Sequence, residues 1–94
     1  MTAAKRPFPL GQTVATPGAL AALEKDGEQP ATFLDRHVRN DWGNVCHDDW
    51  KANDEALELG ERVLSSYMLK DGTKIWIITE ADRSATTILL PEEY

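Results

Sequence analysis

The stretch VLSSYMLKDGTKIWIIT, residues 63–79, decides the fold that this sequence predicts. Two runs rich in β-branched and aromatic residues, 63–69 and 74–79, enclose Asp71-Gly72, a strong signal for a tight turn between antiparallel strands. With a two-residue turn, Tyr67 would lie opposite Trp76, and Met68 opposite Ile75. Both faces of this hairpin are apolar, so we expect helices on one face and a partner or the N-terminal arm on the other.

Outside the hairpin, the sequence predicts one more C-terminal strand and three short helices. Residues 85–90 form the third strand of an antiparallel meander, and Pro91 ends it. The helices begin at Thr16-Pro17, at Pro30, and at His47 or Asp48, and glycines close the first and third. Residues 11–16 are a candidate N-terminal strand. The fold class is therefore α+β, with three short helices packed on a small antiparallel sheet. We expect an extended arm over residues 1–9 and a single domain over residues 10–94.

Composition excludes several classes of protein. The chain has 94 residues, with 16 acidic and 10 basic side chains and a net charge of −6. This balance argues against direct nucleic-acid binding through overall charge. The apolar runs are too short for a transmembrane helix, and a single cysteine cannot form an internal disulfide. The N-terminus has no apolar stretch of the kind that a secretory signal needs, so we expect a cytoplasmic protein.

The net charge is concentrated in residues 40–61, where seven acidic residues and one basic residue give −6. The rest of the chain has nine acidic and nine basic residues, so its net charge is zero. Most of the acidic residues in 40–61 fall on the predicted third helix. One half of its helical wheel is acidic, and we expect the other half to face the core. The expected core half consists of Trp50, Ala52, Asn53, Ala56, Leu57 and Leu59. We expect this acidic side to contact a basic protein surface, because carboxylates along a helix partly imitate nucleic-acid phosphates. The predicted partner-binding residues are Asp48, Asp54, Glu55, Glu58 and Glu61.

A second hypothesis is a metal- or cysteine-dependent enzyme centred on His37, Asp41, Cys46 and His47, which lie within 11 residues. Zinc takes cysteine and histidine ligands, but the spacing matches no closed zinc motif. His37 falls on the apolar face of the second helix, which is typical of a hydrogen-bonded core histidine. Cys46 is expected to be a buried, unreactive thiol, because nearby carboxylates oppose its ionisation. The preferred interpretation is therefore a protein that is not an enzyme and that has no cofactor or metal.

Three segments resemble a family of small, mostly uncharacterised bacterial proteins of about this length, found on plasmids and other mobile elements. Some members carry the label of subunit M of type I restriction enzymes, although a methyltransferase needs a cofactor domain larger than this chain. The segments are 10–20, 33–43 and 74–94, with Thr79-Glu80-Ala81-Asp82-Arg83-Ser84 as the most specific part.

The resemblance implies an accessory protein of mobile DNA. Together with the concentration of negative charge on the third helix, it leads us to expect a non-enzymatic binding protein that modulates a host nucleic-acid-handling or defence protein through the acidic helix. The resemblance also makes Glu80, Asp82 and Arg83 a candidate recognition loop, the alternative being a turn held by local hydrogen bonds. A structural homodimer is the third hypothesis. No membrane partner is expected.

Overall fold

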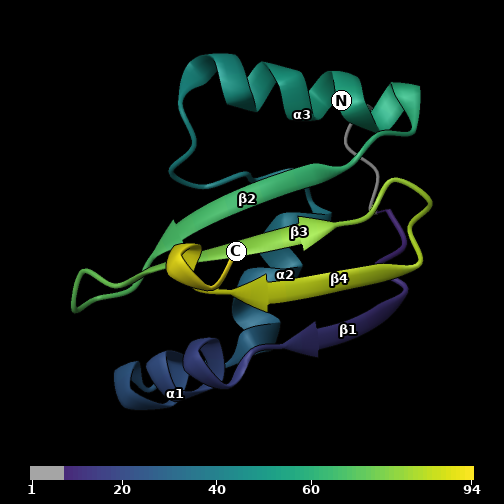
Figure 1. The fold of residues 1–94 in the computed structure, drawn as a ribbon. Helices are drawn as coiled ribbons and strands as arrows, with labels where there is room; N and C mark the ends of the chain where they lie inside the picture. Colours follow the sequence, from purple (N-terminus) through teal and green to yellow (C-terminus); the bar gives the residue numbers. More distant parts are fainter. Residues whose placement is uncertain (1–7) are drawn as a thin grey trace.

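The computed structural model describes residues 8–94 and shows an α+β fold built on one four-stranded sheet, which confirms the predicted class (Figure 1). The elements in chain order are β1 (Gln12–Ala15), α1 (Pro17–Asp26), α2 (Pro30–Val38), α3 (His47–Leu59), β2 (Val63–Met68), β3 (Lys74–Thr79), β4 (Ala85–Leu89) and the short 3₁₀ helix η1 (Pro91–Glu93). None of the described helices has the length and apolar content needed to cross a bilayer.

The strand order is β1-β4-β3-β2, and the predicted meander and N-terminal strand are both present. β2, β3 and β4 pair antiparallel, but β1 runs parallel to β4, so the sheet is mixed rather than purely antiparallel. The parallel pairing follows from the chain path, because α1, α2 and α3 lie between β1 and the meander and return the chain to the sheet. The predicted arm lies outside the described residues except for Phe8 and Pro9.

The predicted helix ends agree with the structure. The Thr16 hydroxyl accepts a hydrogen bond from the Ala19 N–H at 3.2 Å, and Pro17 begins α1. Gly27 and Gly60 end α1 and α3 in the left-handed conformation that glycine adopts without strain. Local capping chemistry therefore sets these boundaries.

The predicted hairpin register is wrong by one residue. Tyr67 pairs with Ile75 and Met68 with Lys74, because the loop has three residues rather than two. Leu69 and Thr73 close this loop, with Leu69 N–H donating to the Thr73 carbonyl at 2.7 Å, and Gly72 takes the left-handed position at its end. A type I turn followed by a left-handed glycine is the usual form of such a loop.

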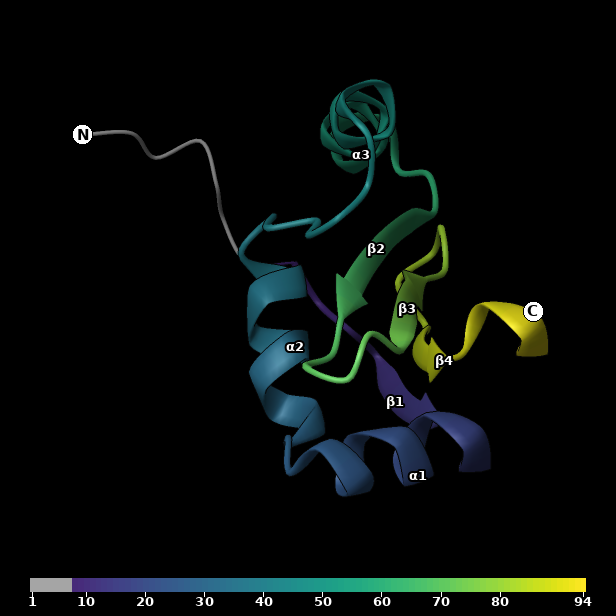
Figure 2. The same cartoon turned by 90° about the vertical axis from the view of Figure 1, so that its left-hand side faces the viewer.

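Helix α2 covers one face of the sheet, α1 lies at the end of the sheet that β1 occupies, and α3 lies apart from both along the β2 edge (Figures 1 and 2). The main core lies between the first two helices and the sheet. A smaller cluster beneath α3 contains Trp42, Ala56 and Val63. The large side chains of the main core are Leu23, Phe33, Tyr67, Leu69, Ile75, Ile77 and Ile88.

The outer edge of β2 is closed by hydrogen bonds from the segment before α3 and from α3 itself. The Asn53 side chain donates to the Leu64 carbonyl at 2.7 Å and accepts from the Leu64 N–H at 3.1 Å. Ser66 N–H donates to the Trp42 carbonyl at 3.0 Å, and the Ser66 carbonyl accepts from Asn44 N–H. Four edge groups that another strand could pair with are thus used inside the domain.

Gly43 makes this closure possible. Its φ is +76°, and a Cβ there would lie 2.1 Å from the Ser66 carbonyl oxygen, whereas a Cβ on Gly60, at φ +72°, would meet nothing within 4 Å. We expect Gly43→Ala to lower the free energy of unfolding by about 3 kcal/mol or more, from left-handed strain plus a backbone clash. Gly60→Ala should cost about 1 kcal/mol, from strain alone. Urea unfolding followed by tryptophan fluorescence measures both, and equal losses would contradict the close approach.

Candidate functional site

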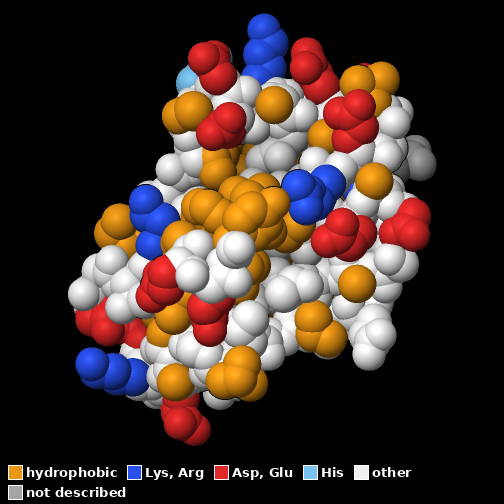
Figure 3. Space-filling view, viewed as in Figure 1, with side chains coloured by type: hydrophobic (Ala, Val, Ile, Leu, Met, Phe, Trp, Pro, Cys, Tyr) orange, Lys and Arg blue, Asp and Glu red, His pale blue; other side chains and the backbone are white. Residues whose placement is uncertain are grey.

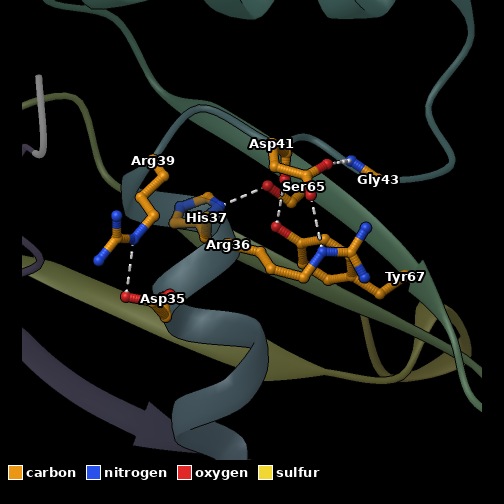
Figure 4. Close-up of polar contacts among 8 residues, drawn as sticks. All are labelled: Asp35, Arg36, His37, Arg39, Asp41, Gly43, Ser65 and Tyr67. Carbon is orange, nitrogen blue, oxygen red and sulfur yellow. Dashed lines mark hydrogen bonds and ion pairs between the residues drawn. The ribbon is translucent and has the colours of Figure 1, made fainter. Parts of the chain in front are cut away.

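His37 is fully buried at the centre of a chain of hydrogen bonds that joins α2 to three strands. Its Nδ1 contacts the Ser65 hydroxyl on β2, and its Nε2 lies 2.8 Å from the Thr79 hydroxyl on β3. Thr79 lies 2.8 Å from Thr86 Oγ1 on β4, and Thr86 donates to the Leu10 carbonyl at 2.7 Å. Figure 4 shows the His37–Ser65 contact from α2 onto the sheet.

The donors and acceptors of this chain fix the tautomer of His37. The Leu10 carbonyl can only accept, so Thr86 donates to it and receives the Thr79 proton. The Thr79 oxygen then accepts from His37 Nε2–H, and Nδ1 accepts from the Ser65 hydroxyl. Burial, followed by the charge of Arg83, lowers the pKa of His37 to about 3. The ring is therefore neutral, with its proton on Nε2.

The structure does not bring the four residues of the predicted metal or enzyme centre together. Both ring nitrogens of His37 are occupied, and neither His37 nor Ser65 is exposed to solvent. Within residues 8–94, no group of three histidine, cysteine or acidic side chains could hold a metal ion.

Asp41 binds Arg36 instead, with Arg36 Nε donating to Asp41 Oδ2 at 2.8 Å, as drawn in Figure 4. The Arg36 guanidinium lies over the Tyr67 ring, 4.6 Å from its centroid. Tyr67 donates its phenolic proton to the Asp41 carbonyl at 2.6 Å, and burial is the main reason why its pKa rises to about 12. These contacts fasten the end of α2 to the sheet.

Cys46 and His47 are exposed at the start of α3, so the expectation of a buried cysteine is wrong. Cys46 occupies the N-cap position, with an extended backbone, outside the helix whose apolar side packs on the sheet. An N-cap residue precedes the helical turn, so the apolar pattern of the helix does not determine its burial.

Four of the five predicted partner-binding carboxylates are exposed: Asp48, Glu55, Glu58 and Glu61. No salt bridge is recorded for these four within the described chain. Red side chains gather in Figure 3 over the position of α3, above a hydrophobic patch on the sheet face. Asp48, Glu55 and Glu58 lie on α3, and Glu61 follows Gly60, which caps the helix. This acidic surface is the candidate functional site.

Asp54, the fifth predicted residue, is less exposed than the other four. It is partly buried, and its Oδ1 accepts a hydrogen bond from the Trp42 indole N–H at 3.0 Å. Trp42 is itself fully buried and packs edge-on against His37, with ring centroids 5.6 Å apart. This hydrogen bond holds Asp54, and with it α3, against the core.

The predicted core half of α3 is confirmed only in part. Asn53 and Ala56 are buried and Trp50 is partly buried, whereas Ala52 and Leu59 are exposed, Leu59 to 70%. The helix packs only along the β2 edge, so it buries a narrower stripe than a helix lying flat on a sheet. The sequence analysis did not predict that Asn53 binds the backbone of β2. A polar residue at the centre of an apolar half-wheel could have indicated a buried hydrogen bond at this position.

The predicted recognition loop is the turn between β3 and β4. Arg83 Nη1 donates to the Glu80 carbonyl at 3.0 Å and to the Glu61 carbonyl at 2.8 Å, which ties the turn to the end of α3. Asp82 Oδ1 accepts from Ser84 N–H at 3.0 Å, and hydrogen bonds from Ser84 lower the pKa of Asp82. The Glu80 side chain is exposed. Two of the three side chains thus make the local bonds of a structural turn.

Comparisons of the chain with protein-family models, with curated proteins and with solved structures found no match.

The neutral state of His37 predicts a pH dependence of stability. Between pH 6.5 and pH 3 the unfolded chain binds a proton that the folded protein excludes, so stability falls as the pH falls. From pH 6.5 to pH 5, the free energy of unfolding should drop by roughly 1.5 kcal/mol. Urea titrations at several pH values measure the drop. His37→Gln keeps a donor and an acceptor without a titrating ring, and it should remove the slope. An equal slope in both proteins would contradict this account.

Proposed function

We propose that this protein is a non-enzymatic binding protein that contacts a basic protein surface through the acidic side of α3. The observation that carries this proposal is the exposure of Asp48, Glu55 and Glu58 along one helix, with no salt bridge recorded for them in the described chain. Opposite charges across an interface mainly speed association and select the partner. The setting is an accessory role in a mobile genetic element.

The spacing of the carboxylates favours one class of basic partner. The helical carboxylates from Asp48 to Glu58 span roughly 15 Å at about 1.5 Å per residue. Duplex DNA carries about one charge per 1.7 Å, so the helix offers a sparser row of negative charge, interrupted by Lys51. A surface that binds nucleic-acid phosphates would accept such a row. We therefore place the contact on the nucleic-acid-binding surface of a host nucleic-acid-handling or defence protein.

The attachment of α3 supports this role. Asn53 holds the helix to the backbone of Leu64, and Asp54 holds it to Trp42. These bonds lie on the side of α3 that faces the sheet, so the opposite side is kept toward solvent in one orientation. A surface ordered before binding loses less conformational entropy when a partner docks.

A capture experiment with matched variants tests the proposal. The immobilised protein should retain basic proteins from a bacterial lysate at low salt and release them at high salt, because exposed charges are screened. Added duplex DNA should also release them by competing for the same surface. The triple variant Asp48→Asn, Glu55→Gln, Glu58→Gln should lose this capture.

The control carries the same change in net charge elsewhere. Glu24, Asp35 and Glu92 are exposed and lie outside α3, so the variant Glu24→Gln, Asp35→Asn, Glu92→Gln should retain the partner. Equal losses in the two triple variants would show that only overall charge matters and would overturn the assignment to α3. Capture that DNA does not displace would overturn the assigned class of partner.

A further inference from the structure

Within residues 8–94, no strand or loop pairs with the outer edge of β1, whereas the outer edge of β2 is closed. Among the described residues β1 pairs with β4 alone. The Gln12 N–H donates to the Ser84 carbonyl at 2.9 Å, and the Thr16 N–H donates to the Ile88 carbonyl at 2.9 Å. Because hydrogen-bonding direction alternates along a strand, Thr13 and Ala15 direct their N–H and C=O groups away from β4.

The side chains of β1 do not protect this edge. Natural edge strands are usually guarded by charged residues, proline, bulges or a covering segment. β1 consists of Gln12, Thr13, Val14 and Ala15, with no charge and no proline, and its first three residues are exposed. At the other end of the sheet, Asn53, Trp42 and Asn44 satisfy the matching groups of β2. Within the described residues, the outward backbone groups of β2 are therefore hydrogen-bonded, whereas those of β1 have no backbone partner.

We propose that the β1 edge is the interface with a second copy of this chain, paired antiparallel about a two-fold axis at Val14. In this register the Thr13 N–H donates to the carbonyl of Ala15 in the second copy, and the Thr13 carbonyl accepts from the N–H of that same Ala15. The two-fold axis repeats these two hydrogen bonds between Ala15 of the first copy and Thr13 of the second. Every outward-facing group of Thr13 and Ala15 then has a partner. The two sheets join into one continuous eight-stranded sheet.

The charge distribution favours a second copy of the chain as the partner of the β1 edge. The excess negative charge lies on and around α3, which packs beside β2 at the opposite end of the strand order β1-β4-β3-β2 (Figure 1). Pairing through β1 places the two acidic helices at the two far ends of the joined sheet, where screening by salt weakens their repulsion. Pairing through the other end would bring them together.

Val14 is the exposed apolar side chain of β1 that this arrangement covers. Its side chain is 42% exposed and lies on the sheet face away from α2, since Ala15 packs into the core on the opposite face. At the two-fold axis, two Val14 residues form a non-hydrogen-bonded pair, with Cα atoms about 4.5 Å apart. This exposed apolar side chain would then be covered by its own copy.

Sedimentation equilibrium of three variants tests the interface. The unmodified protein should dimerise. Thr13→Pro removes an N–H that faces away from β4, so it should leave the monomer folded and abolish the dimer. Val14→Lys places like charges directly opposite each other and should raise the dimer dissociation constant about tenfold or more, although it lowers the net negative charge. Met68→Lys makes the same change at another exposed apolar residue, 53% exposed on β2, and should leave the dimer intact.

Disulfide trapping tests the register. In a Cys46→Ser background, Val14→Cys should cross-link to itself rapidly under mild oxidation, because the expected Cα separation lies within disulfide range. Met68→Cys in the same background should cross-link far more slowly. A monomeric unmodified protein, or equal cross-linking of the two cysteine variants, would overturn the proposal. Circular dichroism confirms that each variant is folded.

Discussion

The pairing of the Asn53 side chain with both backbone groups of Leu64 is the constraint on which the arrangement of this domain depends. One amide group attaches α3 to the sheet and ends the sheet at β2. A backbone pair left unbonded there would either be hydrated or recruit another strand. Since α3 is held by this face, its carboxylates turn outward. The same attachment makes the two ends of the sheet different. The β2 end is acidic and closed, whereas the β1 strand carries no charge and has no outer partner in the part of the chain that the structure describes.

The chain of hydrogen bonds through His37 fixes how α2 packs on the sheet, as the Asn53 pairing fixes α3. A buried imidazole with an unsatisfied nitrogen would be costly, but each of its nitrogens meets a hydroxyl from a different strand. The chain ends at the Leu10 carbonyl, so it orders the protons in one direction. Trp42 packs edge-on against this ring and binds Asp54, and so joins the interior network to the attachment of α3. The acidic surface is therefore supported by the core and does not depend on the helix alone.

Local chemistry made much of the fold predictable from sequence. Thr16-Pro17, Gly27 and Gly60 set helix ends through their own backbone preferences, and the strand runs lie where β-branched and aromatic residues concentrate. Features set by distant contacts were not predictable. The hairpin register depended on whether the loop had two or three residues, and both faces were apolar enough to accept either. Asp54 looked like the other acids of α3, because nothing local indicates that Trp42, 12 residues earlier, places its indole N–H beside it. Cys46 resembled a core residue in type, but it occupies the exposed N-cap position of α3.

Amide hydrogen exchange at Leu64 tests the central claim most directly. The Leu64 N–H points outward from β2, which is an edge strand, and an amide hydrogen in that position normally exchanges quickly with solvent. We predict that its protection in the unmodified protein approaches that of Ile77 in the central strand β3. Asn53→Ala should remove this protection at Leu64 and leave that of Ile77 largely unchanged. Rapid exchange at Leu64 in the unmodified protein would contradict the account, since α3 would then not be fixed to the sheet by this pairing.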